Sequence, residues 1–526
     1  MLADGMKTDR LLIAVISAVI IVNAFLFLLS RDLTFVHIDA IAHVNKARGL
    51  FDNVTPGLRQ LGTIWLPLPH LLIVPFTAIN SLWISGTAGS LLSIACFVGT
   101  SLFLYSIGYA WTGAKFVGWM AFLCFALNPR LIYLFTTPMT EPLMVFCAVG
   151  LFYYLLRWSE EGSWNQFAMA ALFVFAGTLT RYEGWALAAT AVVMIPFLAQ
   201  RQRAASTILF AGAASAGPML WMLYNMIYFD DPLMFTFGRG SARDYAQEYF
   251  FRTGKTFATA GKFWDSLSTY FIDVAYCVNP VVLWFGIAGL VLSLAMLRTR
   301  YWRPTVILSS GALVPFVFYV YNLYSNSVPL LMPGLVKDEP DSIFNVRYGT
   351  VMAATIPLFA AMFLFFLIRQ VDRHRMFSLL LLTPLFLPDP IPGASAEPVA
   401  EQFTRNLFYT EAIHNQSFWM PPFIEVAQKL KADMDDQPGS ILTNTRIVHV
   451  VVWATGIPMR RFVNEMNKGY WEPNLSVIQP DIRWVITEEG DLLWHAQGKF
   501  LREHFVDVAQ AKTPSTGIVH LYKRPE

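Results

Sequence analysis

Charged residues are scarce in this chain. Only 14% of its 526 residues are Asp, Glu, Lys or Arg, whereas 55% are hydrophobic. Soluble globular domains have about a quarter of their residues charged, so this composition excludes an ordinary soluble domain and indicates a polytopic membrane protein. The formal net charge of +2 is too small to suggest a nucleic-acid partner.

Cysteine pairs and nucleotide-binding motifs are also lacking. The chain has four cysteines, none in a C-x-x-C pair and most of them inside apolar runs, so neither redox chemistry nor a cysteine metal site is indicated. Neither a Walker loop nor a G-x-G-x-x-G motif opens a helix. The D-x-D of "DMDD" at 433–436 ends an amphipathic stretch, and we interpret it as a solvated helix end rather than a sugar-nucleotide site.

Long apolar runs dominate the sequence instead. The first, from Leu11 to Leu29, is too long for a signal-peptide core and lacks a convincing small-residue cleavage site after it, so we expect a retained first span. Further runs of spanning quality lie at 88–109, 117–134, 141–157, 166–180, 184–199, 205–228, 279–297, 304–322, 346–368 and 376–392. The sequence therefore predicts about 11 transmembrane helices.

Basic residues predict the orientation of these spans. If the amino terminus is cytoplasmic, the clusters "RQR" at 201–203, "RTRYWR" at 298–303 and "RQVDRHR" at 369–375 all fall on the inner side, as the positive-inside rule requires. The outer side then receives the loops 30–87, 229–278 and 323–345, the short connections 135–140 and 181–183, and the tail from 393.

Two outer segments have features of their own. Pro67, Pro69 and Pro75 interrupt the apolar part of the first outer loop, which favours helices lying at the membrane surface. From about residue 420 the composition becomes that of a small soluble module, with helical spacing in "PPFIEVAQKLKADMDD" and strand candidates "SILTN", "RWVITEE" and "GIVHLYKR". We expect a membrane domain at 1–392, a linker at 393–419 and an outer α/β domain at 420–526.

Acidic residues at the outer edges of spans indicate where chemistry could take place. Asp39, Glu141 and Glu183 all lie at such edges, in "HIDAIAH", "TTPMTEPLMVF" and "TRYEGWAL". Charge at membrane depth is costly, so residues at these positions tend to be paired or functional. The three acids form a candidate site on one side of the membrane.

These features together resemble a known superfamily. An acid soon after the first span, proline-rich surface helices, Glu-Pro-Leu at the start of a span and the late "NVRYGTVMAATIPLF" look like the GT-C integral-membrane glycosyltransferases, which include protein O-mannosyltransferases and lipid A aminoarabinose transferases. The resemblance covers about residues 10–392. This chain has Asp39-Ala40 where many mannosyltransferases have an Asp-Glu pair, so the subfamily stays open.

The resemblance implies a fold, a reaction and partners. The fold is an all-α polytopic GT-C bundle with outer juxtamembrane helices, here followed by the small α/β domain. The activity is an inverting transfer of a sugar from a polyprenyl-phosphate donor to a hydroxyl of a protein, lipid or glycan. The place is the outer face of a membrane, such as the bacterial plasma membrane.

Asp39 is the candidate general base. A carboxylate within hydrogen-bond reach can take the proton from an acceptor hydroxyl as it attacks the anomeric carbon. The structural alternative is that Asp39 caps the helix that follows it. His43 lies one turn further on the same face and is a candidate to orient Asp39 or contact substrate. The pattern of His37, Asp39 and His43, with Glu141 as a fourth ligand, is also a weak candidate for a divalent metal site.

The other candidate residues bind substrate. Glu141 is expected to shape the acceptor pocket or bind the sugar, and its alternative is an acid that stabilises a helix start. Arg181 and Glu183 are equally well explained as an ion pair at the membrane boundary. Arg347 is expected to stabilise the departing lipid phosphate, with Tyr348 donating a hydrogen bond beside it, and its alternative is a snorkelling arginine.

Two other classes of function fit the same composition. A secondary transporter also has many spans with charges at their edges, although no inverted repeat is evident in this sequence. A non-catalytic lipid-binding or scaffold protein would keep the same fold without the reaction.

Overall fold

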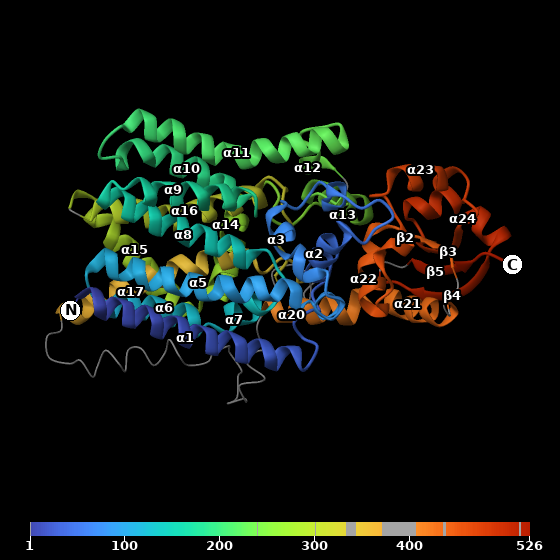
Figure 1. Ribbon diagram of the computed structural model, residues 1–526, viewed down its shortest axis with the longest axis horizontal. Helices are drawn as coiled ribbons and strands as arrows, with labels where there is room; N and C mark the ends of the chain where they lie inside the picture. The colour runs from blue at the N-terminus through green and yellow to red at the C-terminus, as the bar shows by residue number, and fades with distance from the viewer. Residues whose placement is uncertain are drawn as a thin grey trace. The chain divides into compact units, whose positions relative to one another are not determined.

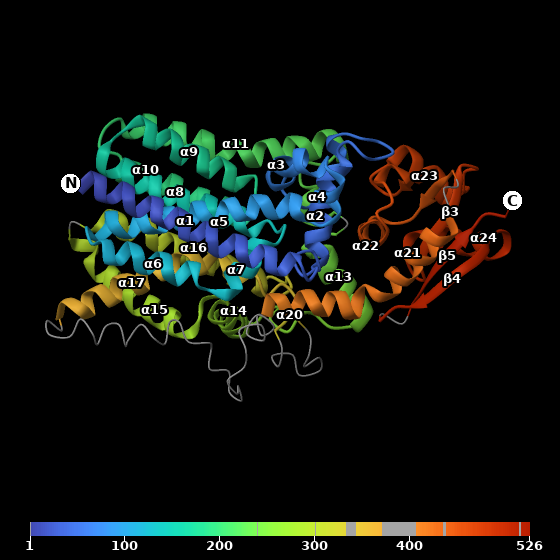
Figure 2. The ribbon, with the colours of Figure 1, turned by 60° about the horizontal axis from the view of Figure 1, so that its bottom comes forward.

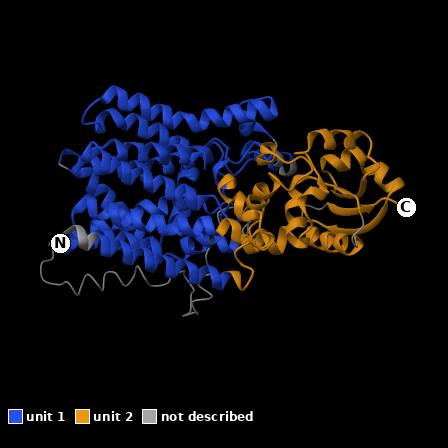
Figure 3. Ribbon diagram, viewed as in Figure 1, with its two compact units in different colours: residues 1–28, 63–69, 91–411 blue, residues 29–62, 70–90, 412–526 orange. Residues whose placement is uncertain are grey.

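The protein is described from a computed structural model, which covers residues 2–238, 240–299, 301–332, 343–370, 407–434, 438–514 and 517–525. The chain divides into two compact units, coloured separately in Figure 3. Unit 1 comprises residues 1–28, 63–69 and 91–411, and unit 2 comprises residues 29–62, 70–90 and 412–526. Each unit is therefore assembled from segments that are far apart in the sequence.

Unit 1 is helical. Its elements are α1 (Leu2–Leu29), α5 (Thr87–Thr112), α6 (Lys115–Ala126), α7 (Pro129–Thr136), α8 (Glu141–Glu161), α9 (Trp164–Thr178), α10 (Glu183–Leu198), α11 (Arg203–Phe229), α12 (Met234–Phe237), α13 (Ala242–Thr253), α14 (Phe263–Val278), α15 (Pro280–Ala295), η2 (Met296–Arg298), α16 (Trp302–Tyr324), η3 (Tyr348–Val351), α17 (Met352–Gln370) and α20 (Leu407–His414). The long helices run side by side and roughly parallel in both views (Figures 1 and 2). They form the bundle that an integral membrane protein requires.

Within the described residues, seven helices are long and apolar enough to cross a membrane, or eight if a bent pair counts as one span. They include seven of the predicted spans, and the predicted span 117–134 is the bent pair α6 and α7. The predicted spans 166–180 and 184–199 are helices of 15 and 16 residues, which is short for a crossing. The predicted span 376–392 lies outside the described residues, so the count of 11 stays a prediction.

The bend between α6 and α7 has a local cause. The side chain of Asn128 accepts hydrogen bonds from the backbone N–H groups of Arg130 and Leu131, at 3.0 and 3.4 Å, and Pro129 occupies the first turn of α7. This arrangement is that of a new helix start, so the chain changes direction by 65° here.

Small residues let some helices approach closely. At Gly289 in α15, an added Cβ atom would collide with the carbonyl oxygen of Phe359 in α17. In lipid, helices gain no hydrophobic free energy by associating, so close packing of this kind is what holds them together.

Unit 2 is an α/β module together with part of the first predicted outer loop. Its elements are α2 (Ile38–Gly49), η1 (Leu58–Leu61), most of α3 (Leu68–Thr77), α4 (Asn80–Ile84), the π-helix η4 (Asn415–Trp419), α21 (Pro421–Met434), β1 (Ser440–Leu442), α22 (Thr445–Thr455), η5 (Met459–Arg461), β2 (Phe462–Val463), α23 (Lys468–Ser476), β3 (Ile482–Glu488), α24 (Leu492–His504), β4 (Val506–Lys512) and β5 (Ile518–Lys523). The short helices α2, α3 and α4 match the predicted break-up of the first outer loop.

The described part of unit 2 contains one five-stranded sheet in the order β2-β1-β3-β5-β4. β1 is parallel to β2 and β3, whereas β5 is antiparallel to both β3 and β4. The three predicted strands are present as β1, β3 and β5. The sequence did not predict β2, which has only two residues, or β4, whose "VDVAQAK" leaves several side chains exposed at the edge of the sheet.

The predicted membrane fold with a small C-terminal α/β module is confirmed. The predicted boundary at residue 392 lies outside the described residues, so it stays a prediction. Within the predicted linker 393–419, the described residues 407–419 form α20 and the π-helix.

Candidate functional site

Glu141 is the centre of a charged cluster inside unit 1. Its side chain is fully buried at the start of α8. One oxygen, Oε1, accepts hydrogen bonds from Arg181 Nη1 at 2.9 Å and from Arg347 Nε at 2.7 Å. One carboxylate oxygen thus binds the guanidinium groups of two residues that are 166 positions apart in the sequence.

Arg181 lies in the connection between α9 and α10 and has further partners. Its Nε donates to Glu183, which begins α10, so the predicted ion pair of Arg181 and Glu183 is present. Its Nη1 also donates to Thr140 Oγ1 at 3.2 Å, and its Nη2 donates to Tyr319 Oη at 3.3 Å. These contacts fix the plane of the Arg181 guanidinium group. The group lies at the amino-terminal ends of α8 and α10, which are the ends predicted to face the outer side.

Glu411 extends the cluster from α20. It is fully buried, and its two oxygens accept the backbone N–H groups of Asn345 at 2.8 Å and Val346 at 3.2 Å. Its Oε1 also lies 3.5 Å from Arg347 Nη1. Glu411 therefore holds both the backbone and the side chain of the segment that carries Arg347. The sequence analysis missed this residue because it assigned "YTEAIH" to a linker.

Tyr348 covers the arginines. The guanidinium carbons of Arg181 and Arg347 each lie 5.7 Å from the centre of its ring. The ring stacks on Tyr319 at 5.0 Å, and Tyr319 stacks on Tyr270 at 5.1 Å. Aromatic faces at this distance favour cations, so the stack stabilises the buried guanidinium groups.

The cluster holds more carboxylates than guanidinium groups. Three carboxylates (Glu141, Glu183 and Glu411) face two guanidinium groups (Arg181 and Arg347). Arg347 is only 6% exposed and paired, so the alternative of a snorkelling arginine is wrong. Glu141 Oε2 is buried without a hydrogen-bond partner in the described chain. A buried oxygen of this kind is costly unless another molecule donates to it.

The structure thus brings five of the predicted site residues into one cluster (Glu141, Arg181, Glu183, Arg347 and Tyr348). Asp39 and His43 belong to unit 2 and are described there. Their roles, like those of the clustered residues, stay predictions.

Asp39 lies in the first turn of α2 and is half-buried. The residue that caps this helix is His37, whose Nδ1 accepts a hydrogen bond from the backbone N–H of Asp39 at 3.2 Å. The alternative of Asp39 as the capping residue is therefore wrong. A carboxylate in the first turn of a helix is still stabilised by the positive end of the helix dipole.

His43 contacts another histidine. Its Nδ1 lies 2.9 Å from Nε2 of His70 in α3, and both side chains are buried. In the part of the chain that the structure describes, no three His, Cys, Asp or Glu side chains lie together in a way that could hold a metal ion. His37, Asp39 and His43 are not such a group, and a site that also includes Glu141 of unit 1 stays a prediction.

Asp433 of the "DMDD" sequence accepts hydrogen bonds from Trp484 and Lys523. Burial raises its pKa, but these two hydrogen bonds and the charge of Lys523 outweigh burial and hold the pKa below its usual range. Asp433 is thus a structural residue of unit 2, in agreement with the reading as a helix end.

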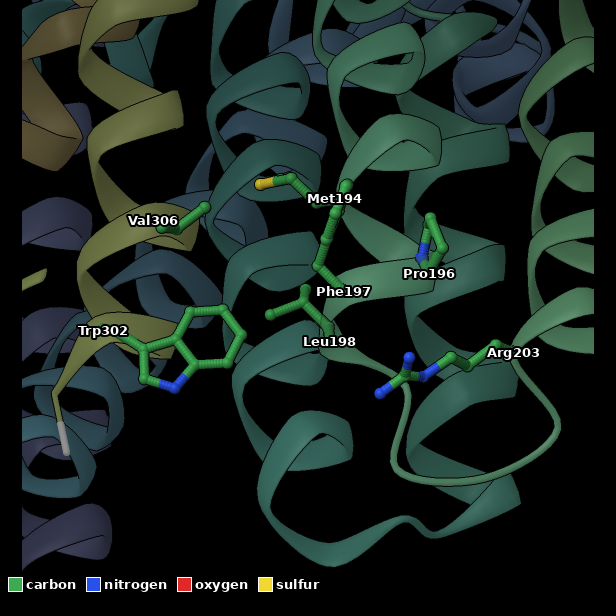
Figure 4. Close-up of a pocket in the computed structure, with 7 residues that line it drawn as sticks. All are labelled: Met194, Pro196, Phe197, Leu198, Arg203, Trp302 and Val306. Atoms are coloured by element: carbon green, nitrogen blue, oxygen red, sulfur yellow. The ribbon is translucent and has the colours of Figure 1, made fainter. Parts of the chain in front are cut away.

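A pocket of about 420 Å³ is lined by apolar side chains of α10 and α16, with Trp302 and Arg203 at its rim (Figure 4). Its α10 residues, such as Leu198, lie at the opposite end of that helix from Glu183. A helix of 16 residues is about 24 Å long, so this pocket is separate from the cluster.

Comparison with known proteins identifies the fold. No family model and no curated protein matches the chain. Among solved structures, ArnT from Cupriavidus metallidurans bound to undecaprenyl phosphate aligns with a TM-score of 0.53 and 12% identity, covering 96% of this chain and 97% of that one. The apo state of the same ArnT gives 0.52 and 12%, covering 99% and 98%. The apo oligosaccharyltransferase of Archaeoglobus fulgidus gives 0.51 and 12%, covering 98% and 74%.

These likenesses extend over nearly the whole chain and concern the fold. The structures matched are GT-C glycosyltransferases, so the chain has the fold that the sequence resemblance predicted. It is an integral membrane protein with that bundle and a C-terminal α/β module.

Proposed function

We propose that this protein is an inverting glycosyltransferase that moves a sugar from a polyprenyl-phosphate donor to an acceptor hydroxyl on the outer face of the membrane. The carrying observation is the buried cluster around Glu141, in a fold shared with an ArnT structure bound to undecaprenyl phosphate. A buried group of this kind at the ends of membrane helices is expensive to maintain, which supports a functional role.

In the proposed reaction Asp39 is the base. Its carboxylate accepts the proton of the acceptor hydroxyl while the hydroxyl oxygen bonds to the anomeric carbon. The bond between that carbon and the phosphate oxygen breaks, and its electron pair leaves with the polyprenyl phosphate. The anion needs no strong acid to protonate it, and the configuration at the anomeric carbon inverts.

Arg347 stabilises the departing phosphate in this proposal. Its two contacts with carboxylates differ in length. Arg347 Nε lies 2.7 Å from Glu141 Oε1, whereas Arg347 Nη1 lies 3.5 Å from Glu411 Oε1. We expect the donor phosphate to exchange with Glu411, the longer contact, while Glu141 keeps the guanidinium in place. Guanidinium groups bind phosphate through paired hydrogen bonds, which strengthen as negative charge develops on the leaving oxygen.

Glu141 Oε2 is the proposed contact for the sugar. A sugar hydroxyl that donates to this oxygen would supply the hydrogen bond that the described residues do not. Because a polar site rejects a substrate that leaves it unpaired, this contact would help to select the sugar. The proposed steps use only the side chains named above.

Transfer itself is the decisive experiment. The purified protein is incubated with a panel of radiolabelled polyprenyl-phosphate sugars and extracted cell envelope, and label in the envelope fraction is counted. We expect transfer from at least one donor, with Asp39→Asn as the control for background. Transfer from none of them would contradict the proposal.

One observation favours the transporter alternative. Asp273 in α14 is fully buried, and within the described residues its carboxylate has no ion pair and no side-chain donor, only an interaction with the backbone of Gly349. Acids buried in this way relay protons in many transporters. Proton-driven uptake into vesicles that is lost in Asp273→Asn, without any sugar transfer, would support this alternative over the transferase.

We also propose that the amino terminus is cytoplasmic and that the α/β module is outside, on the basis of the basic clusters. A reporter fused after Glu526 is then expected outside, and one fused after Arg203 inside. Cytoplasmic reporter activity at the carboxyl terminus would contradict this orientation, because the segment after the first span and the module belong to one unit and must lie on the same side of the membrane.

A further inference from the structure

The first outer segment and the C-terminal module form one unit, although hundreds of residues separate them in the sequence. The segment 38–62 contains α2, whose first turn carries Asp39. Its contacts with residues 449–467 make a seam inside unit 2, which we define by Asn45, Asp52, Asn53 and Thr55 on one side and by His449, Arg460 and Asn467 on the other.

Asn45 joins α2 to two other helices. Its side-chain Nδ2 donates to the carbonyl oxygen of His449 in α22 at 3.3 Å. Its Oδ1 accepts a hydrogen bond from Trp83 Nε1 in α4 at 2.9 Å. Asn45 is 2% exposed, so these bonds form without competition from water. The amide orientation is fixed by having both a donor and an acceptor partner.

Asn467 joins the residues that follow α2. Its Nδ2 donates to both Asn53 Oδ1 and Thr55 Oγ1 at 2.6 Å, and its Oδ1 accepts the backbone N–H of Asn464 at 3.1 Å. Asn467 is completely buried. Beside it, Val54 packs against the apolar core of the sheet module. The segment after α2 is therefore part of the module's own core.

Asp52 adds a charged contact near the end of α2. Its two oxygens accept from Arg48 Nε at 2.9 Å and from Arg460 Nη1 at 3.3 Å. Arg48 also donates to the carbonyl oxygen of Thr77 at 2.7 Å. The C-terminal half of α2 and its exit are thus held by backbone and side-chain groups of the module and by a backbone carbonyl of α3.

We propose that the C-terminal module positions the Asp39 helix, with Asn45 and Asn467 as positioning residues. This inference rests on the proposed function, because it concerns the base of that reaction. The module fixes α2 at its C-terminal end, and α2 is one rigid helix of 12 residues, so its N-terminal turn is fixed as well. A displacement of about 1 Å in a catalytic group can cost about a hundredfold in rate.

The experiment compares two buried asparagines in the full-length protein: Asn467, which precedes α23, and Asn474 within α23. Asn467→Ala breaks the seam. Asn474→Ala is the matched control, because Asn474 is equally buried but bonds only to Tyr470 and Gln479 within the module, among the contacts that the structure gives. Three quantities are measured: hydrogen exchange of the amides at 38–49, and the kcat and the donor KM of sugar transfer.

We expect Asn467→Ala to speed exchange in α2 and to lower kcat by about 10- to 100-fold, with donor KM changed less than about twofold. Asn474→Ala should leave exchange in α2 and kcat within about twofold of the unchanged protein. Asn45→Ala, which acts from α2 itself, should behave like Asn467→Ala.

A second pair of substitutions, at Thr55, tests the seam in case Asn467→Ala does not fold. Thr55 is half-buried, and its hydroxyl accepts from Asn467 and Gln60. Thr55→Val removes this acceptor at nearly constant volume and should lower kcat, whereas Thr55→Ser keeps the acceptor and should restore it.

The outcomes separate the two proposals. Unchanged exchange in α2 in both Asn467→Ala and Thr55→Val would overturn the positioning role, whatever the activity. Faster exchange with unchanged kcat would also overturn it, since α2 would then be loosened without effect on the reaction. Absence of transfer by the unchanged protein would contradict the proposed function instead.

Discussion

The cluster around Glu141 and the seam around Asn467 are both buried and polar, but they are built from different groups. The cluster in unit 1 consists of carboxylates and guanidinium groups, whereas the buried bonds of the seam in unit 2 are made by the neutral amides of Asn45 and Asn467, with one ion pair of Asp52 and Arg460 beside them. A buried charge that loses its partner is far more costly than a buried amide that loses one hydrogen bond. The cluster should therefore tolerate little change, while the seam can be loosened in small steps.

Asp39→Asn should have the largest effect on turnover. It tests whether the helix that the seam holds carries the catalytic base. The substitution keeps the size of the side chain and leaves the His37 cap in place, but removes the base. Turnover is expected to fall by about 2 to 4 orders of magnitude, the range of general-base catalysis, with donor binding nearly intact. Single-turnover transfer and donor binding measure the two separately. Near-normal transfer would remove the base assignment and leave the seam without a catalytic group to position.

Glu141→Ala should have the largest effect on stability. It leaves Arg181 and Arg347 buried without their shared carboxylate, which costs about 3–5 kcal/mol. Thermal unfolding in detergent measures this loss. The matched control is the exposed Glu425→Ala, which should change stability by less than about 0.5 kcal/mol. Equal midpoints for the two variants would mean that the cluster's charges are not stabilising one another.

Arg347→Lys distinguishes charge from geometry in the cluster. Lysine keeps the positive charge but lacks the planar group that binds two oxygens at once. We expect donor KM to rise by about tenfold in Arg347→Lys, and kcat also to fall in Arg347→Ala. Arg203→Lys, at the separate pocket, serves as the control. Full activity of Arg347→Lys would show that a point charge is sufficient.

The last prediction concerns the pH dependence of stability at His449, on the seam. Burial and the charge of Lys46 lower the pKa of His449 to about 3, from 6.5. Below pH 6.5 His449 is protonated in the unfolded chain but stays neutral in the folded chain. The free energy of unfolding should therefore decrease as the pH falls toward 3. At pH 5 this amounts to about 2 kcal/mol. His449→Asn should reduce the loss of protection that β3 amides show between pH 7 and pH 5.

The same protection difference in His449→Asn and the unchanged protein would contradict this account. Lys46 is the other titratable group facing His449 in these contacts, and burial lowers its pKa to about 8. It therefore stays largely protonated between pH 7 and pH 5 and does not produce the same change.

The different chemistry of the two regions also explains what could be predicted from the sequence. Glu141, Arg181 and Arg347 are visible because a charge at the edge of an apolar run is unusual and needs a reason. Their common location follows from the order of the spans. The ion pair of Arg181 and Glu183, two positions apart, was likewise within reach of local reasoning.

The seam could not be predicted in the same way. Asn45, Asn53 and Asn467 lie in segments where asparagine is ordinary, and their pairing depends on how the sheet module folds. Glu411 was missed for a related reason, since nothing near it in the sequence shows that its partners are the backbone N–H groups of Asn345 and Val346. The alternative that Asp39 caps α2 is wrong because the helix begins at Ile38, two residues before the expected start at Ala40, with His37 as its cap.

The pairing of Asn53 with Asn467 spans 414 positions of the chain. A ribosome adds about 5–20 residues per second, so the segment after α2 is made about 20 to 80 seconds before its partner. During that interval Val54 has no module core to pack against, and Asn53 lacks its partner Asn467. Synthesis of the last part of the chain therefore completes the surroundings of one of its first helices, and a truncated product would carry Asp39 on a helix that its own module has never held.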